Sequence, residues 1–170
     1  MSNIIQLSRR RFMRGQIKKE SLPRLPWAVE EKTFLHGCTQ CNKCISSCEQ
    51  DIIKRDKLGF PFVDFDQDEC SFCNKCIDIC DEPIFNEPKL GPAFPGDFNI
   101  NNKCLAKNNI YCQSCRDVCD SKAISFTYLE SAIPEPELNL SDCNQCGACV
   151  SICPQDAITF QLETIKNERI

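Results

Sequence analysis

The residues of this chain whose spacing suits chemistry are its sixteen cysteines, which fall into four groups of four. The last group runs from Cys143 to Pro154 and reads C-x2-C-x2-C-x3-C-P, the ligand run of a [4Fe–4S] cluster. Thiolates spaced in this way let a tight loop wrap one corner of a cubane, and Gly147 suits a backbone that must approach inorganic sulfide. In proteins with two such clusters, the fourth cysteine of one run ligates the neighbouring cluster.

The other three groups repeat this unit, and no cysteine is left over. Two of them have the same spacing without the proline, and the third is stretched to C-x7-C-x2-C-x3-C. The groups are Cys38, Cys41, Cys44 and Cys48; Cys70, Cys73, Cys76 and Cys80; Cys104, Cys112, Cys115 and Cys119; and Cys143, Cys146, Cys149 and Cys153. An apolar pair follows each group at 52–53, 84–85, 123–124 and 157–158, and possible strands precede the later groups at 60–65, 98–100 and 138–140. The repeating unit is therefore strand, ligand loop, short helix, strand.

Disulfides and zinc are the alternative uses of so many cysteines. A secreted disulfide framework should follow an apolar signal segment, which the sequence does not contain, and cysteines packed this closely would mostly close very small loops. Zinc sites usually pair two C-x2-C knuckles or combine cysteines with histidines. Here each group has four cysteines rather than a single C-x2-C pair, and His36 is the single histidine. The sequence therefore favours four [4Fe–4S] clusters as the staples of a chain with a small apolar core.

The charge and the remaining motifs exclude several function classes. The formal charge is −4, and four oxidised clusters with their thiolates would bring it to about −12, which disfavours nucleic acid as a partner. No span approaches the length of a membrane helix, and no G-x-G-x-x-G fingerprint occurs. With one histidine, acid–base catalysis is poorly supplied, and no group lacks the cysteine whose absence would open an iron to substrate. We expect an electron-transfer protein without its own substrate site.

Residues 1–36 form a basic N-terminal extension that we expect to be largely irregular. It contains Ser8-Arg9-Arg10-Arg11-Phe12, which resembles a twin-arginine export signal, but residues 15–21 are too charged for the apolar segment such a signal needs. Arg9, Arg10 and Arg11 are therefore candidate partner-binding residues, with a solvated tail of no specific role as the alternative. Trp27 is expected to pack on the first module rather than to bind a ligand.

The repeat predicts an α+β fold of two tandem ferredoxin-like modules, each with two [4Fe–4S] clusters. We place the first module at residues 37–88, a linker at 89–97, the second module at 98–160 and a polar tail at 161–170. The seven residues between Cys104 and Cys112 enlarge one ligand loop of the second module.

The chain resembles the NapF family of ferredoxin-type proteins over nearly its whole length. The resemblance is carried by the stretched third group and by short matches at 8–10, 26–27, 34–35, 70–73, 104–106 and 143–149. It implies a cytoplasmic iron–sulfur protein that meets the catalytic molybdoenzyme subunit of periplasmic nitrate reductase before export and assists its maturation, by electron transfer or cluster assembly. A general low-potential electron carrier between redox enzymes is the alternative.

Two ways of sharing the cysteines among the clusters are open. Pairing neighbouring groups keeps the connections short, and an alternative pairs the outer two groups with each other and the inner two likewise. The first scheme, which we favour, gives four mixed sets: Cys38, Cys41, Cys44 and Cys80; Cys70, Cys73, Cys76 and Cys48; Cys104, Cys112, Cys115 and Cys153; and Cys143, Cys146, Cys149 and Cys119.

Overall fold

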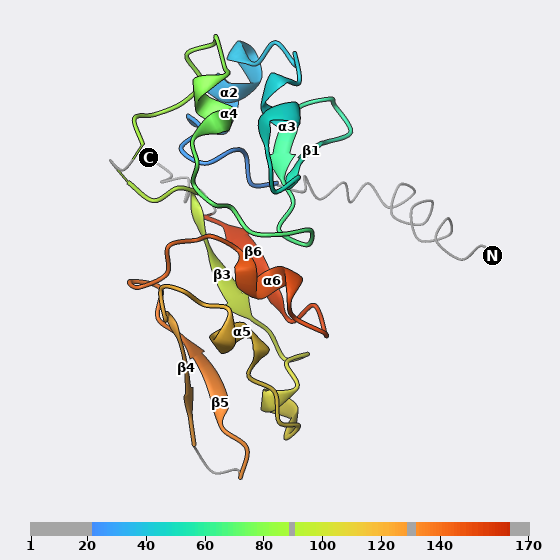
Figure 1. The fold of residues 1–170 in the computed structure, drawn as a ribbon, viewed down its shortest axis with the longest axis vertical. Helices are drawn as coiled ribbons and strands as arrows, with labels where there is room; N and C mark the ends of the chain where they lie inside the picture. The colour runs from blue at the N-terminus through green and yellow to red at the C-terminus, as the bar shows by residue number, and fades with distance from the viewer. Residues whose placement is uncertain (1–21, 89–90, 129–131, 164–170) are drawn as a thin grey trace, which may run out of the picture.

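The computed structural model describes residues 22–88, 91–128 and 132–163 of the chain. Two modules of short helices and two-stranded sheets follow one another along the long axis of the molecule (Figure 1). The α+β fold class is as predicted, whereas Arg9, Arg10 and Arg11 lie outside the described residues. None of the helices in these three segments has the length and apolar character that crossing a membrane requires.

The first module combines three short helices with one antiparallel strand pair. The helices are α2 (Glu31–Gly37), α3 (Lys43–Ser47) and α4 (Lys75–Asp78), and the strands are β1 (Ile53–Arg55) and β2 (Pro61–Val63). The strand predicted over 60–65 is thus present but shorter. Burial alternates along it, with Val63 and Phe65 buried and Phe62 and Asp64 intermediate, as expected of a strand with one face on the core.

The second module has two strand pairs. Its elements are β3 (Gly96–Ile100), the 3₁₀ turn η1 (Ala106–Asn108), α5 (Ser114–Asp117), β4 (Ile124–Thr127), β5 (Glu135–Leu138), α6 (Ala148–Ser151) and β6 (Ile158–Leu162). Strand β3 pairs antiparallel with β6, and β4 pairs antiparallel with β5. The strands therefore connect the start of the module to its end and enclose the ligand loops between them.

The position predicted for the strand at 138–140 was wrong, since β5 occupies Glu135–Leu138. Asn139 ends the strand because its side-chain oxygen accepts a hydrogen bond from Ser141 N–H at 3.1 Å, which closes a turn. Pro136 lies inside β5 opposite Phe126, which a two-stranded sheet tolerates because one edge of each strand needs no donor.

The described part of the N-terminal extension packs on the first module. Val63 N–H donates to Pro23 O at 2.8 Å, and Val29 N–H donates to Ile84 O at 3.0 Å. An isolated antiparallel bridge joins Ala28 to Phe85, in the place that the β3–β6 pair takes in the second module. Residues 22–29 therefore supply the first strand-like segment of the first repeat.

The stretch expected to be a linker is an ordered part of the core in its described portion. Phe94 is fully buried, and Ala93 O accepts a hydrogen bond from Trp27 N–H at 2.7 Å. The ring of Phe94 packs on Phe65 of the first module, with ring centroids 5.3 Å apart in an edge-to-face arrangement. One continuous set of buried side chains thus runs through both modules.

Candidate iron–sulfur centres

Each ligand loop is shaped by residues in the left-handed backbone region. In three of the four loops, the residues on both sides of the second cysteine have positive φ: Gln40 and Asn42, Phe72 and Asn74, and Gln145 and Gly147. The third loop differs because seven residues separate its first two cysteines, and its turn is made by Asn109 at φ 61°. Asparagine and glycine tolerate this conformation best, which explains their recurrence just before the short helices.

This conformation turns backbone N–H groups toward the sulfurs. The first thiols of three groups, on Cys38, Cys70 and Cys143, each accept a hydrogen bond from the N–H two residues further on. The Sγ of Cys153 accepts one from Ala157 N–H at 3.3 Å. Backbone donors of this kind stabilise negative charge on sulfur, as metal-bound thiolates require.

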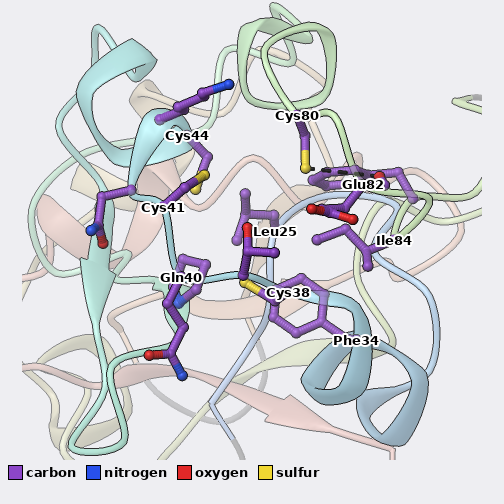
Figure 2. A pocket seen from close by; sticks show the side chains of 14 residues that line it. Leu25, Phe34, Cys38, Gln40, Cys41, Cys44, Cys80, Glu82 and Ile84 are labelled. Carbon is purple, nitrogen blue, oxygen red and sulfur yellow. Dashed lines mark hydrogen bonds between the residues drawn. The ribbon is translucent and has the colours of Figure 1, made fainter.

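The first cavity brings together cysteines from two groups. Cys38, Cys41 and Cys44 line it together with Cys80, and apolar side chains such as Leu25 form its walls (Figure 2). Cys80 Sγ also lies 3.8 Å from Glu82 O, as the dashed line in Figure 2 shows. The single histidine, His36, is exposed in α2 and is not among the residues that line this cavity.

Two further cavities have the same mixed composition. One is lined by Cys70, Cys73, Cys76 and Cys48, and the other by Cys104, Cys112, Cys115 and Cys153. In each, three thiols come from one group and the fourth from the end of the neighbouring group.

The four remaining cysteines are neighbours in the second module. Burial, and after it the nearby thiols of Cys146, Cys143, Cys115 and Cys119, raise the pKa of Cys149 to about 12. Cys119 is also an electrostatic neighbour of Cys143 and Cys146. The structure thus gathers these four thiols into one region.

Burial perturbs the thiols in all four regions in the same direction. It raises the pKa of Cys44, Cys70 and Cys115 to about 11 and that of Cys76 to about 12. Without a cation, such thiols hold their protons at neutral pH, and metal ligation must displace those protons.

The donor set fits iron–sulfur clusters. Four thiols, apolar walls and backbone N–H groups directed at sulfur are what a thiolate-held cubane needs. Within the described segments, no three His, Cys, Asp or Glu side chains converge closely enough to hold a single metal ion. The thiols are grouped around cavities rather than around one point.

Comparison with known proteins agrees with this chemistry. A family model described as "4Fe-4S dicluster domain" matches residues 37–83 and again residues 110–157. The chain is 42% identical over 158 residues to "Ferredoxin-type protein NapF" of Escherichia coli strain K12, covering 92% of this chain and 96% of that protein. It is 39% identical over 165 residues to the protein of the same name from Haemophilus influenzae, covering 91% and 93%. The chain belongs to the ferredoxin-type NapF family.

Membership of the NapF family fixes the cofactor. Two dicluster domains with sixteen cysteines bind four [4Fe–4S] clusters, and the protein is an iron–sulfur electron-transfer protein.

Sequence reasoning missed one functional residue of the ligand loops. Gln145 is buried, and its amide hydrogen-bonds to the backbone of Phe94 and Gly96 in the segment between the modules. No feature of the sequence distinguishes it from Gln40, which holds the equivalent place in the first loop but is exposed.

Proposed function

We propose that the clusters are held by mixed sets of cysteines, three from one group and the fourth from its neighbour. The observation that carries this assignment is the composition of the three thiol-lined cavities, each of which takes its fourth cysteine from the neighbouring group of the same module. The rival scheme, in which outer groups pair with outer groups, would need Cys153 beside Cys38, Cys41 and Cys44. Cys153 instead lines a cavity with Cys104, Cys112 and Cys115.

Substitution of Cys153 by serine tests the assignment. In anaerobically prepared protein, the variant should lose or alter the cluster of the third group, with iron and sulfide falling by up to about a quarter. Paramagnetic spectra of the reduced protein should show the cluster of the third group lost or altered and the cluster held by Cys38, Cys41 and Cys44 still present. Loss of the cluster bound by Cys38, Cys41 and Cys44 would establish the rival scheme.

The proposed biological role is to assist the catalytic molybdoenzyme subunit of periplasmic nitrate reductase in the cytoplasm before that subunit is exported. NapF membership supports this role, and so does the use of every cysteine as a ligand, which would leave no iron open to a substrate. The protein would deliver electrons to the partner, or support assembly of the partner's cluster, while Arg9, Arg10 and Arg11 help to bind it.

Affinity capture under anaerobic conditions tests the partner. The tagged full chain should retain the unexported catalytic subunit, and Arg9→Gln with Arg10→Gln should weaken that retention. Lys18→Gln with Lys19→Gln is the matched control, because it removes equal charge from the same basic stretch. Equal retention by both double variants would contradict the role of the arginines. No retention by the unchanged chain, with rapid electron exchange toward several acceptors, would instead identify a general electron carrier.

A further inference from the structure

The two modules touch through their cluster ligands. Cys70 belongs to the first module and Cys146 to the second, yet Cys70 N–H donates to Cys146 O at 2.7 Å. The Cys146 thiol is also one of the neighbours that raise the pKa of Cys70, after burial and the thiols of Cys48 and Cys73. One ligand loop of each module therefore abuts the other.

Ligand residues also approach one another within each module. Cys44 of the first set is an electrostatic neighbour of Cys76 in the second set. Cys115 of the third set is likewise a neighbour of Cys149 in the fourth. With the contact between Cys70 and Cys146, the sets follow one another in the spatial order first, second, fourth, third. This order differs from the order along the chain.

A buried amide positions the ligand loop that carries Cys146. Gln145 Oε1 accepts a hydrogen bond from Phe94 N–H at 3.0 Å, and Gln145 Nε2 donates to Phe94 O at 3.1 Å and to Gly96 O at 2.6 Å. Gln145 directly precedes Cys146, so these bonds fix the fourth ligand loop to the segment that joins the modules.

A close approach on the other side of Cys146 completes this arrangement. A Cβ placed on Gly147 would lie 2.1 Å from Cδ1 of Phe65, so only glycine lets the ring of the first module reach this loop. Gly147 thus meets the first module directly, and Gln145 binds the segment that joins the modules, so both residues that flank Cys146 hold the loop that approaches Cys70.

We propose that the two modules form one electron conduit, in which the contact between Cys70 and Cys146 is the crossing point and Gln145 is its positioning residue. A single electron passes from one module to the other, which oxidises the donor cluster and reduces the acceptor with no net change in the protein. An external one-electron reductant such as dithionite supplies the charge. The ends of the conduit are the first set, in the module that contains α2 and α3, and the third set, in the module that contains α5 (Figure 1).

Spin coupling in the fully reduced wild-type protein tests the conduit. Reduced clusters are paramagnetic, so paramagnetic resonance at two frequencies distinguishes a chain of four coupled spins from two isolated pairs. We expect coupling across the modules, with the two inner spins each interacting with two others. A spectrum described fully by two isolated pairs would overturn the proposal. This measurement needs no variant.

Gln145→Ala then tests the positioning residue, with Gln40→Ala as the matched control. Gln40 occupies the same place in the first loop and has a similar φ, and its side chain donates to Leu58 O at 3.3 Å within its own module. Gln145→Ala should weaken the coupling between modules and slow electron equilibration between them, with iron content retained, whereas Gln40→Ala should change neither. Unaltered coupling in cluster-replete Gln145→Ala would overturn the positioning role.

The conduit rests on the proposed ligand sets but not on the proposed partner. Capture of the nitrate reductase subunit and coupling between the modules are therefore separate results. If the subunit is not captured, the proposed conduit is unaffected. If no coupling between the modules is found, the proposed interaction with the subunit is unaffected.

Discussion

Arg24 has a structural role that its neighbours in the sequence do not indicate. It lies in a basic stretch, yet its side chain is only 11% exposed. Its guanidinium binds Glu31 through two nitrogens at 2.7 and 2.9 Å and Asp56 at 3.0 Å. It also donates to Pro61 O at 3.1 Å. Arg24 therefore joins the N-terminal segment and α2 to the turn between β1 and β2.

Asp56→Asn should destabilise the first module. Asp56 is 10% exposed, and its other oxygen accepts from the N–H groups of Leu58 and Phe60 at 2.9 Å. The asparagine would keep those two bonds but present an N–H₂ group to Arg24, whose charged partner among the described residues would then be Glu31 alone. We expect a loss of about 2 kcal/mol, seen as earlier thermal loss of cluster absorption. Lys54→Met, which removes an exposed partner of Asp51, should cost about 0 to 1 kcal/mol.

The effect of Asp56→Asn should be constant with pH above the acid range. Burial tends to raise the pKa of Asp56, but hydrogen bonds from Arg24, Phe60 and Leu58 outweigh it and lower the pKa below its ordinary value. A carboxyl with a lowered folded pKa contributes stability above its unfolded pKa and loses it as pH falls through the folded value. The wild-type and variant proteins should thus differ equally between about pH 5.5 and 8. A difference that grew or shrank across that range would contradict the assignment.

Two serine hydroxyls lie against ligand sulfurs of the third group. Cys119 Sγ is 3.5 Å from Ser121 Oγ, and Cys112 Sγ is 3.8 Å from Ser114 Oγ. A metal-bound thiolate accepts hydrogen bonds, and such bonds favour the reduced, more negative state of a cluster. Ser121→Ala should therefore shift one of the four reduction potentials to a more negative value in a titration followed by paramagnetic resonance. Ser125→Ala, on the exposed side of β4, should leave all four unchanged. A positive shift would contradict this reasoning.

At the scale of elements, pairing between distant segments organises both modules. In the second module, β3 and β6 run side by side from Gly96 opposite Leu162 to Ile100 opposite Ile158. This pairing places the first strand of the repeat against the last and closes the module around its ligand loops. At Gly96, the backbone of β6 lies so close that it leaves no space for a Cβ.

Gly96→Ala should disrupt this pairing. A Cβ at Gly96 would lie 2.2 Å from Gln161 O and 2.8 Å from Leu162 Cα, and backbone atoms cannot move aside as a flexible side chain does. The cost should be at least about 1 to 3 kcal/mol, with faster amide exchange along β3 and β6. Gly91→Ala is the control, because a Cβ there meets nothing within 4 Å. Unchanged amide exchange along β3 and β6 in the Gly96 variant would contradict this prediction, because it would show that the strand pairing accommodates a Cβ at this position.

The sequence predicted the elements that repeat and missed those that do not. The apolar pairs after the cysteine groups were foreseen, and Ile52, Ile53, Ala123 and Ala157 are indeed buried. The part played by residues 22–29 was not foreseen, because the bridge between Ala28 and Phe85 joins positions far apart in the chain and leaves no periodic signal. Gln145 was missed for the same reason, since its partners are in another segment and glutamine has no fixed preference for such a place.

At the scale of the whole molecule, aromatic rings join the modules. Phe65, which follows β2 of the first module, packs edge-to-face on Phe94 and Phe98 at centroid distances of 5.3 and 5.2 Å. It also contacts Phe160 of β6 at 5.7 Å. Because Phe65 is 5% exposed and three of its ring neighbours come from residues 94–160, its side chain belongs physically to the second module.

Phe65→Ala should therefore make the two modules unfold at different temperatures. Removing the ring leaves a cavity between Phe94, Phe98 and Gly147, with an expected cost of about 3 to 5 kcal/mol. Phe62→Ala is the control, because Phe62 is on the opposite, half-exposed face of the same strand segment.

Calorimetry and cluster absorption, recorded together during heating, measure the outcome. The wild-type protein should lose both modules in one transition, since ligand loops and rings cross between them and the Gln145 amide holds one of those loops to the joining segment. Phe65→Ala should show two transitions, and Phe62→Ala only one. A single transition in all three proteins would mean that Cys70 and Gln145 hold the modules together without the ring. Two transitions already in the wild type would mean that the continuous core does not make the modules unfold together. The contact between Cys70 and Cys146 would then open when one module unfolds, and it could not serve as a fixed path between the ligands of the two modules.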